Sequence, residues 1–404
     1  MMVCWPNGPR RGTHCVPHEP VHHRRDQRID LLRGVALAMI FVNHVPGTIW
    51  EQLTSRNFGF SDAAEAFVLM SGIAAGIAFG PAFLAAAPLR ARLRPWRRAV
   101  TLWGVHVLIS VLILLIFALM RWDPAIAQMA KARNIVAVLN DPAGYLPSLG
   151  LLAHQFAYAD ILPLYVVLMI AGPGILWLAV RWPRALMAGS LGLWFVTGLL
   201  RIRVPTWPQD NAWFFNPLSW QVLFVAGILT GLAIRQRRRW LPVRRWAVAL
   251  AWGIVALAAI WRMVPVVADW GGHAFWALHE YAGLPGVLTG FDKSFLFLPR
   301  LLHIAALAYA LSTLPALRRL ADSRHVAPLT LMGRHSLPVF ATGTVLAYLG
   351  QITKAIAPPS HLLDAAIIWG GLAILYLVAR WRESRKNPAP AGPSRAGLAR
   401  PATT

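Results

Sequence analysis

The chain has 404 residues, of which 57% are hydrophobic and only 14% charged, and its formal net charge is +23. Apolar stretches of about 20 residues recur along its whole length, which is typical of a polytopic membrane protein and excludes a soluble globular chain. The excess of positive charge could instead indicate nucleic-acid binding, so its distribution along the chain decides between these two classes.

Ten apolar stretches predict an all-α fold of about ten transmembrane helices. They lie at 29–50, 63–85, 99–120, 160–181, 185–201, 217–234, 246–265, 295–315, 331–353 and 362–380. Together they define one membrane domain, 29–382. The basic tail 1–28 and the tail 383–404, whose last part is rich in Pro, Ala, Gly and Ser, are expected to be disordered.

The basic residues alternate between successive loops. Of the 39 Lys and Arg residues, 28 fall in the two tails and in every second loop, where acidic residues are few. The positive-inside rule then places both termini in the cytoplasm, and ten spans satisfy it at every loop. The basicity therefore reflects membrane topology, so membrane lipid is an expected partner and nucleic acid is not.

The first predicted span contains two ionisable residues, Arg33 and His44. Eleven residues make about three helical turns, so both side chains project from one face, roughly 16 Å apart along the axis. Ionisable side chains at membrane depth are costly and usually functional. A snorkelling arginine and a histidine bonded between helices would be the structural alternative. The pair favours the functional interpretation, with His44 as a proton acceptor.

Asp62 and Glu65 stand at the periplasmic start of the second predicted span. Their spacing matches a capping box, which is a purely structural explanation. Both also enter the membrane from the side that His44 approaches. A carboxylate beside an imidazole can fix its tautomer and stabilise the imidazolium, so a catalytic role stays equally open.

Three later clusters are candidate binding residues. Asn216, Trp220 and Gln221 open the sixth span, where aromatic residues form either an interfacial belt or a carbohydrate-binding rim. Lys293 and Arg300 open the eighth, where they could grip an anionic substrate, although Arg300 could instead pair with Asp292. The run Arg334, His335 and Ser336 opens the ninth on the cytoplasmic side, where it could contact a phosphorylated donor or cap the helix.

The sequence contains no motif of a nucleotide-binding loop, a metal site or a proton pump. There is no phosphate-binding glycine loop, and no histidine or cysteine cluster has the spacing of a metal site, so no metal is predicted. The acidic residues of the spans are confined to helix ends, which is unlike a proton-coupled pump.

Several blocks of this sequence resemble the OpgC proteins. The blocks are RIDLLRG at 28–34, NH at 43–44, GFSDAAEAF at 59–67, SG at 71–72, NPLSWQ at 216–221 and GRHSL at 333–337. OpgC proteins are bacterial membrane enzymes implicated in succinylating osmoregulated periplasmic glucans, and they are similar to the wider acyltransferase-three superfamily. The resemblance covers about residues 28–382.

The resemblance implies a membrane O-acyltransferase in the bacterial inner membrane. His44 would act as general base on a hydroxyl of a periplasmic glucan, and Arg33 would help hold an acyl-coenzyme A, expected to be succinyl-coenzyme A, as co-substrate rather than as bound cofactor. The geometry of the first span agrees, because Arg33 lies near the cytoplasmic surface. A glycolipid transporter or flippase is the alternative, and a catalytic histidine would distinguish the two.

Overall fold

The computed structural model describes residues 2–5, 14–17, 26–209 and 211–386. Strands β1 (Met2–Trp5) and β2 (His14–Pro17) pair in antiparallel fashion within the tail that was expected to be disordered. The other positions of the tail up to residue 25, and residues 387–404, lie outside the described residues. All remaining regular elements are helices, which agrees with the predicted all-α membrane domain.

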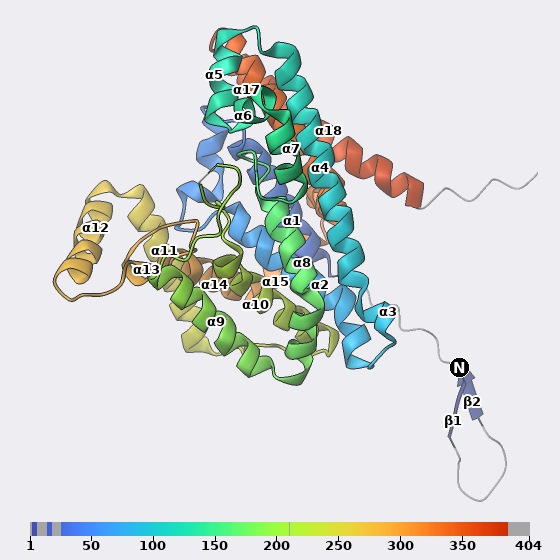
Figure 1. The fold of residues 1–404 in the computed structure, drawn as a ribbon. Coiled ribbons are helices and arrows are strands. Elements are labelled where there is room, and N and C mark those ends of the chain that lie inside the picture. Colours follow the sequence, from blue (N-terminus) through green and yellow to red (C-terminus); the bar gives the residue numbers. More distant parts are fainter. Residues whose placement is uncertain (1, 6–13, 18–25, 210, 387–404) are drawn as a thin grey trace, which may run out of the picture.

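Most helices follow one another with short connections, and residues 200–216 form a longer one (Figure 1). The 3-10 helices are η1 (Ile49–Leu53), η2 (Ser55–Asn57) and η3 (Arg324–Val326). The α-helices are α1 (Gln27–Asn43), α2 (Ala63–Leu84), α3 (Leu89–Arg92), α4 (Arg94–Met120), α5 (Pro124–Ala132), α6 (Ile135–Asn140), α7 (Pro142–Gly150), α8 (Ile161–Arg181), α9 (Pro183–Leu199), α10 (Pro217–Arg235), α11 (Arg245–Met263), α12 (Pro265–Glu280), α13 (Gly286–Thr289), α14 (Leu298–Thr313), α15 (Pro315–Ala321), α16 (Ala327–Arg334), α17 (Ser336–Ile356) and α18 (His361–Lys386).

Seven helices of the described chain are long and apolar enough to cross a membrane: α2, α3 with α4, α8, α10, α11, α17 and α18. An eighth span results if α14 and α15, bent by 78°, count as one. The predicted count of ten is not confirmed. The two shortfalls are α1 and α9, which have 17 residues each and are about 26 Å long, less than the ~30 Å hydrocarbon core.

Small residues allow the central helices to pack closely. Helices α2 and α10 cross where Gly72 and Gly76 face Gly227 and Gly231, and a Cβ on Gly72 would lie 2.3 Å from the carbonyl oxygen of Phe224. Such close backbone approach is the usual way in which membrane helices associate. Helix α2, which carries Asp62 and Glu65 at its start, is therefore fixed in position.

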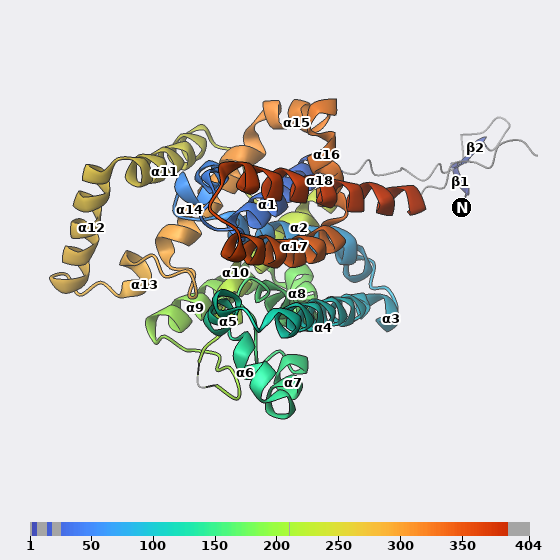
Figure 2. The same ribbon diagram turned by 90° about the horizontal axis from the view of Figure 1, so that it is seen from above.

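Helix α1 is held in the same way against α16. A Cβ on Gly34 would lie 1.8 Å from the carbonyl oxygen of Leu329, and one on Gly333 would lie 1.8 Å from that of Asp30. Figure 2 shows α1 surrounded by α2, α16, α17 and α18. The helix that carries Arg33 and ends beside His44 is thus central and tightly packed.

Two groups of helices lie where the sequence predicts loops. Helices α5, α6 and α7 gather at the end of α4, and α12 projects to one side of the bundle (Figure 1). These segments are shorter or more polar than the spans, so hydropathy does not detect them. The segment from α5 to α8 is the one that matters for function, because it ends in Tyr158 and Asp160 beside the main cavity.

Candidate functional site

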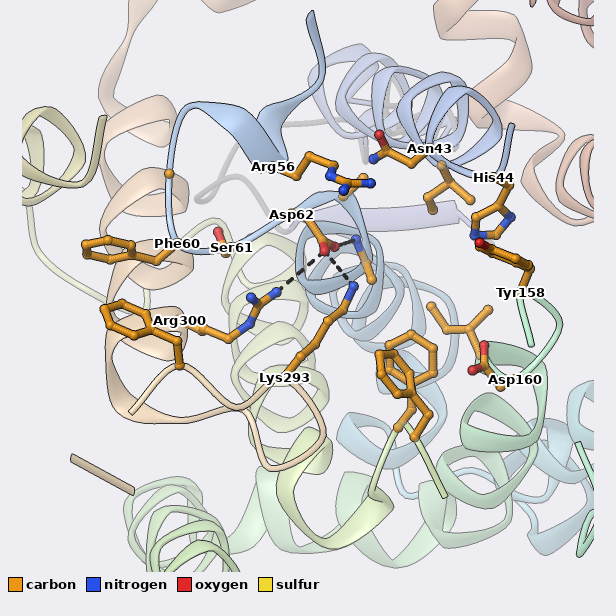
Figure 3. A pocket seen from close by; sticks show the side chains of 18 of the residues that line it. Asn43, His44, Arg56, Phe60, Ser61, Asp62, Tyr158, Asp160, Lys293 and Arg300 are labelled. Carbon is orange, nitrogen blue, oxygen red and sulfur yellow. Dashed lines mark hydrogen bonds and ion pairs between the residues drawn. The ribbon is translucent and has the colours of Figure 1, made fainter. Parts of the chain in front are cut away.

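A cavity of about 560 Å³ lies where α1 ends and where α2 and α8 begin. Its wall brings together residues that are far apart in the sequence, as Figure 3 shows. Among the predicted site residues, His44, Asp62, Lys293 and Arg300 all line it.

His44 follows the last residue of α1 and faces the cavity beside Tyr158, whose ring centroid is 4.7 Å from that of the imidazole. The side chain of Gln351 donates a hydrogen bond to the backbone oxygen of His44, which fixes the end of the helix. Within the described part of the chain, the ring nitrogens of His44 make no hydrogen bond. They are therefore available to a ligand in the cavity, as a general base requires.

Asp62 has two roles in the structure. It caps α2 through the predicted capping box, in which its Oδ1 accepts from the backbone N–H of Ala64 at 2.8 Å and Glu65 accepts from the backbone N–H of Asp62 at 3.0 Å. Its Oδ2 also lies 2.5 Å from Nζ of Lys293 and 3.5 Å from Nη2 of Arg300. Burial alone would raise the pKa of Asp62, but Lys293 and the other partners hold it below its ordinary value, so Asp62 is a carboxylate.

Glu65 is fully buried, and it accepts hydrogen bonds from Nε of Arg300, at 2.8 Å, and from Nη2 of the same guanidinium. The alternative pairing of Arg300 with Asp292 is wrong, because Asp292 pairs with Arg201 at 3.1 Å. Glu65 does not line the cavity, so the structure makes it a support for Arg300 rather than a group in contact with substrate.

The sequence interpretation missed Tyr158 and Asp160. Tyr158 has a φ of 69°, a left-handed conformation that is uncommon for an aromatic residue and that often marks functional sites. Asp160 immediately precedes α8, and its carboxyl lies in the cavity, as Figure 3 shows. An acid at the start of a predicted span was a signal for Asp160, whereas no pattern identifies Tyr158.

Removal from water raises the pKa of Asp160 to about 7. Since this is above the value in an unfolded chain, the folded protein loses stability as the pH rises from about 4 to 7. We expect Asp160→Asn to raise the melting temperature in detergent at pH 8 and to leave it unchanged at pH 4. The same difference at both pH values would contradict this account.

A second cavity, of about 160 Å³, contains Arg33. Nη2 of Arg33 donates to the carbonyl oxygen of Met70 at 2.9 Å, and the residue is buried. Arg98, Tyr165 and Ser336 line the same cavity.

Phe340 lines both the Arg33 cavity and the His44 cavity. Its ring stacks on Phe67, with the two centroids 6.0 Å apart and the planes inclined by 21°. Arg33 and His44, which were expected to share one helix face, therefore line different cavities, and Phe340 belongs to the walls of both.

The predicted donor-binding run is divided in the structure. Glu383 of α18 binds both Arg334 and His335, each at 2.7 Å, and neither residue lines a described cavity. Ser336 lines the Arg33 cavity. The assignment of Arg334 and His335 to the donor is thus not supported, because both side chains hold α16 and α17 against α18. No group of three His, Cys, Asp or Glu residues in the described chain could hold a metal ion.

The predicted acceptor residues at the start of α10 are also divided. Trp220 is fully buried and donates to the carbonyl oxygens of Lys293, at 3.1 Å, and Ser294, at 3.2 Å. Gln221 bonds Ser190 of α9. The expectation that Trp220 and Gln221 contact an acceptor is therefore not supported, since both side chains bond neighbouring residues of the protein instead.

Asn216 caps α10, with its Oδ1 accepting from the backbone N–H of Leu218 at 3.0 Å. It also lines a third cavity, of about 430 Å³, which adjoins the first.

The comparison with known families agrees with the blocks found in the sequence. The model of the OpgC protein family matches residues 25–387, a range that includes every helix around the three cavities. No curated protein and no solved structure matches the chain. The similarity to the acyltransferase-three superfamily stays a prediction. The extent of the match shows that the chain belongs to the OpgC family.

Proposed function

We propose that this protein is an O-acyltransferase of the bacterial inner membrane, which moves an acyl group from acyl-coenzyme A to a hydroxyl of a periplasmic glucan. The observation that carries the proposal is the imidazole of His44, which faces a 560 Å³ cavity with its ring nitrogens unbonded among the described residues. Membership of the OpgC family supports a glucan as the acceptor.

The chemistry needs one base. His44 accepts the proton of a glucan hydroxyl as its oxygen attacks the thioester carbonyl, and a tetrahedral intermediate forms. When that intermediate collapses, the carbon–sulfur bond breaks and the imidazolium returns its proton to the leaving thiolate. The products are a glucan ester and free coenzyme A. Tyr158, packed against the imidazole, orients the ring.

The donor would approach from the Arg33 cavity. Arg33, Arg98 and Ser336 offer positive charge and a hydroxyl to the polar end of the donor. The acyl-carrying arm would then reach His44 by passing the position where Phe67 and Phe340 now stack. No bound cofactor is needed, because acyl-coenzyme A is consumed as co-substrate.

The succinyl group is favoured over acetyl by the charges around the first cavity. Lys293 and Arg300 both line it, and a succinyl group carries a carboxylate that an acetyl group lacks. Asp62 and Glu65 already pair with these two cations, so a succinyl carboxylate would share their N–H donors with Asp62 and Glu65 rather than meet an unpaired charge. Lys293 and Arg300 are therefore the acyl-binding residues of the proposal.

A reconstituted system tests the proposed function. Purified protein in liposomes is given succinyl-coenzyme A on one side and neutral glucan on the other, and the glucan is analysed by mass spectrometry. We expect succinyl esters on the glucan and none when the protein is omitted. Movement of a glycolipid across the bilayer without ester formation would instead establish the transporter or flippase alternative.

Arg33→Ala should raise the KM for acyl-coenzyme A about 10-fold or more, because a hydrogen bond to a charged group contributes about 1.5–3 kcal/mol. The KM for glucan should not change. Arg90→Ala is the matched control, since Arg90 is exposed in the short helix α3 and lines no described cavity. A change confined to the glucan KM would assign Arg33 to the acceptor.

A further inference from the structure

The third cavity adjoins the cavity of His44. It has a volume of about 430 Å³ and shares Ala157, Asp160 and Phe214 with the first cavity. Asp160 therefore lies at the junction of the two cavities. Figure 3 shows it in the wall of the His44 cavity. The family match does not assign any role to this space.

The third cavity carries little net charge. Its cations are Arg201 and Arg203, and its acids are Asp160 and Asp292. Arg201 is already paired with Asp292 at 3.1 Å. Burial lowers the pKa of His154, which keeps that side chain neutral. Arg203 is then the single cation of the lining without a described partner, which is too little positive charge for a donor that bears several phosphate groups.

The remaining side chains of the lining suit an uncharged chain of sugar units. Amide and hydroxyl side chains surround the space together with aromatic faces: Asn134, Gln155, Thr206, Gln209, Asn211, Trp213 and Phe295. Amides can donate to and accept from a sugar hydroxyl, and aromatic faces pack on the apolar face of a sugar ring. Within the described chain, the exposed guanidinium of Arg203 makes no hydrogen bond or ion pair.

The cavity wall is held by hydrogen bonds rather than left loose. The segment between α9 and α10 folds back on itself, with the backbone N–H of Trp213 donating to Val204 at 2.9 Å and that of Thr206 donating to Asn211 at 2.9 Å. The backbone N–H of Trp207 donates to Ala153 at 3.1 Å, which ties this segment to the one before Asp160. The lining side chains are therefore presented in fixed positions.

From this arrangement we infer that the third cavity is a subsite for the sugar units next to the one that is acylated. The reacting sugar occupies the His44 cavity, and its neighbours along the glucan extend past Asp160 and Phe214 to Arg203 and Asn211. The inference rests on the proposed function. It predicts that the enzyme prefers long acceptors to short ones.

The test compares acceptors of different length with one acyl-coenzyme A. For the double variant Arg203→Ala/Asn211→Ala, we expect the KM for a long glucan to rise at least 10-fold, while kcat and the KM for a disaccharide stay unchanged. Both side chains are exposed, so the variant should reach the membrane at normal levels. Arg121→Ala/Gln128→Ala is the matched control, because it removes an exposed cation and amide that line no described cavity.

The possible outcomes distinguish a failure of the proposed subsite from a failure of the proposed function. Equal KM values for long and short acceptors in the wild-type protein, or an unchanged long-glucan KM in the double variant, would overturn the subsite. If no acceptor is acylated, the proposed function fails, and equilibrium dialysis with the long glucan still tests the cavity. Binding that the wild type shows and the double variant lacks would support the subsite, and equal or absent binding would refute it.

Discussion

His44→Ala should abolish acyl transfer while the protein remains folded and inserted in the membrane. Proton transfer by a positioned base contributes ~10²–10⁴-fold to a rate, so the loss of activity per molecule should have this size. The imidazole faces the cavity and is half-buried, which means that its removal leaves no large void in the core. The measurement is glucan ester formed per molecule of membrane protein, with both quantities taken from the same sample.

His106→Ala is the matched control for this experiment. His106 is 1% exposed in α4 and lines no described cavity. Its replacement should lower the amount of protein and leave the activity per molecule unchanged. Normal ester formation by His44→Ala would remove the general base from the mechanism. Asp160 would then be the next candidate, because Glu65 is fully buried in its ion pair with Arg300.

The elements that could be predicted from the sequence depend on local pattern. The spacing of Arg33 and His44 placed both on one face of α1, and the structure has them at the two cavities. The capping box of Asp62 and Glu65 is confirmed because it involves residues three positions apart. Hydropathy identified the long helices because each of them is a continuous apolar segment, which is also a local pattern.

The site residues whose roles could not be predicted from the sequence contact residues that are distant in the chain. The sequence suggested that Arg334 and His335 bind the donor, but in the structure Glu383 of α18 binds both side chains. Trp220 resembled an exposed sugar platform, yet the loop at Lys293 covers it. No local pattern in the sequence contains such contacts, because the packing of whole helices creates them. The predicted count of ten spans is not confirmed for another reason, which is that α1 and α9 are apolar but short.

Arg300→Ala should destabilise the protein strongly, because it leaves the carboxylate of Glu65 fully buried without its partner. Breaking a buried ion pair by removing one member typically costs about 3–5 kcal/mol. We expect a large fall in the melting temperature in detergent and in the membrane protein level. Arg262→Ala is the control, because Arg262 is an exposed arginine on the same cavity, and such surface changes stay within about 0.5 kcal/mol.

Adding Glu65→Gln to Arg300→Ala should restore most of the lost stability, since a neutral amide can still accept from the backbone N–H of Asp62. The double variant then separates folding from recognition. If Arg300 binds the acyl carboxylate, the rescued protein should use succinyl-coenzyme A less efficiently by about 10-fold or more, as expected for a lost charge-assisted hydrogen bond, with acetyl-coenzyme A unaffected. Equal use of both donors before and after the change would make Arg300 a structural partner of Glu65 alone, and Lys293 would remain the cation available to the acyl group.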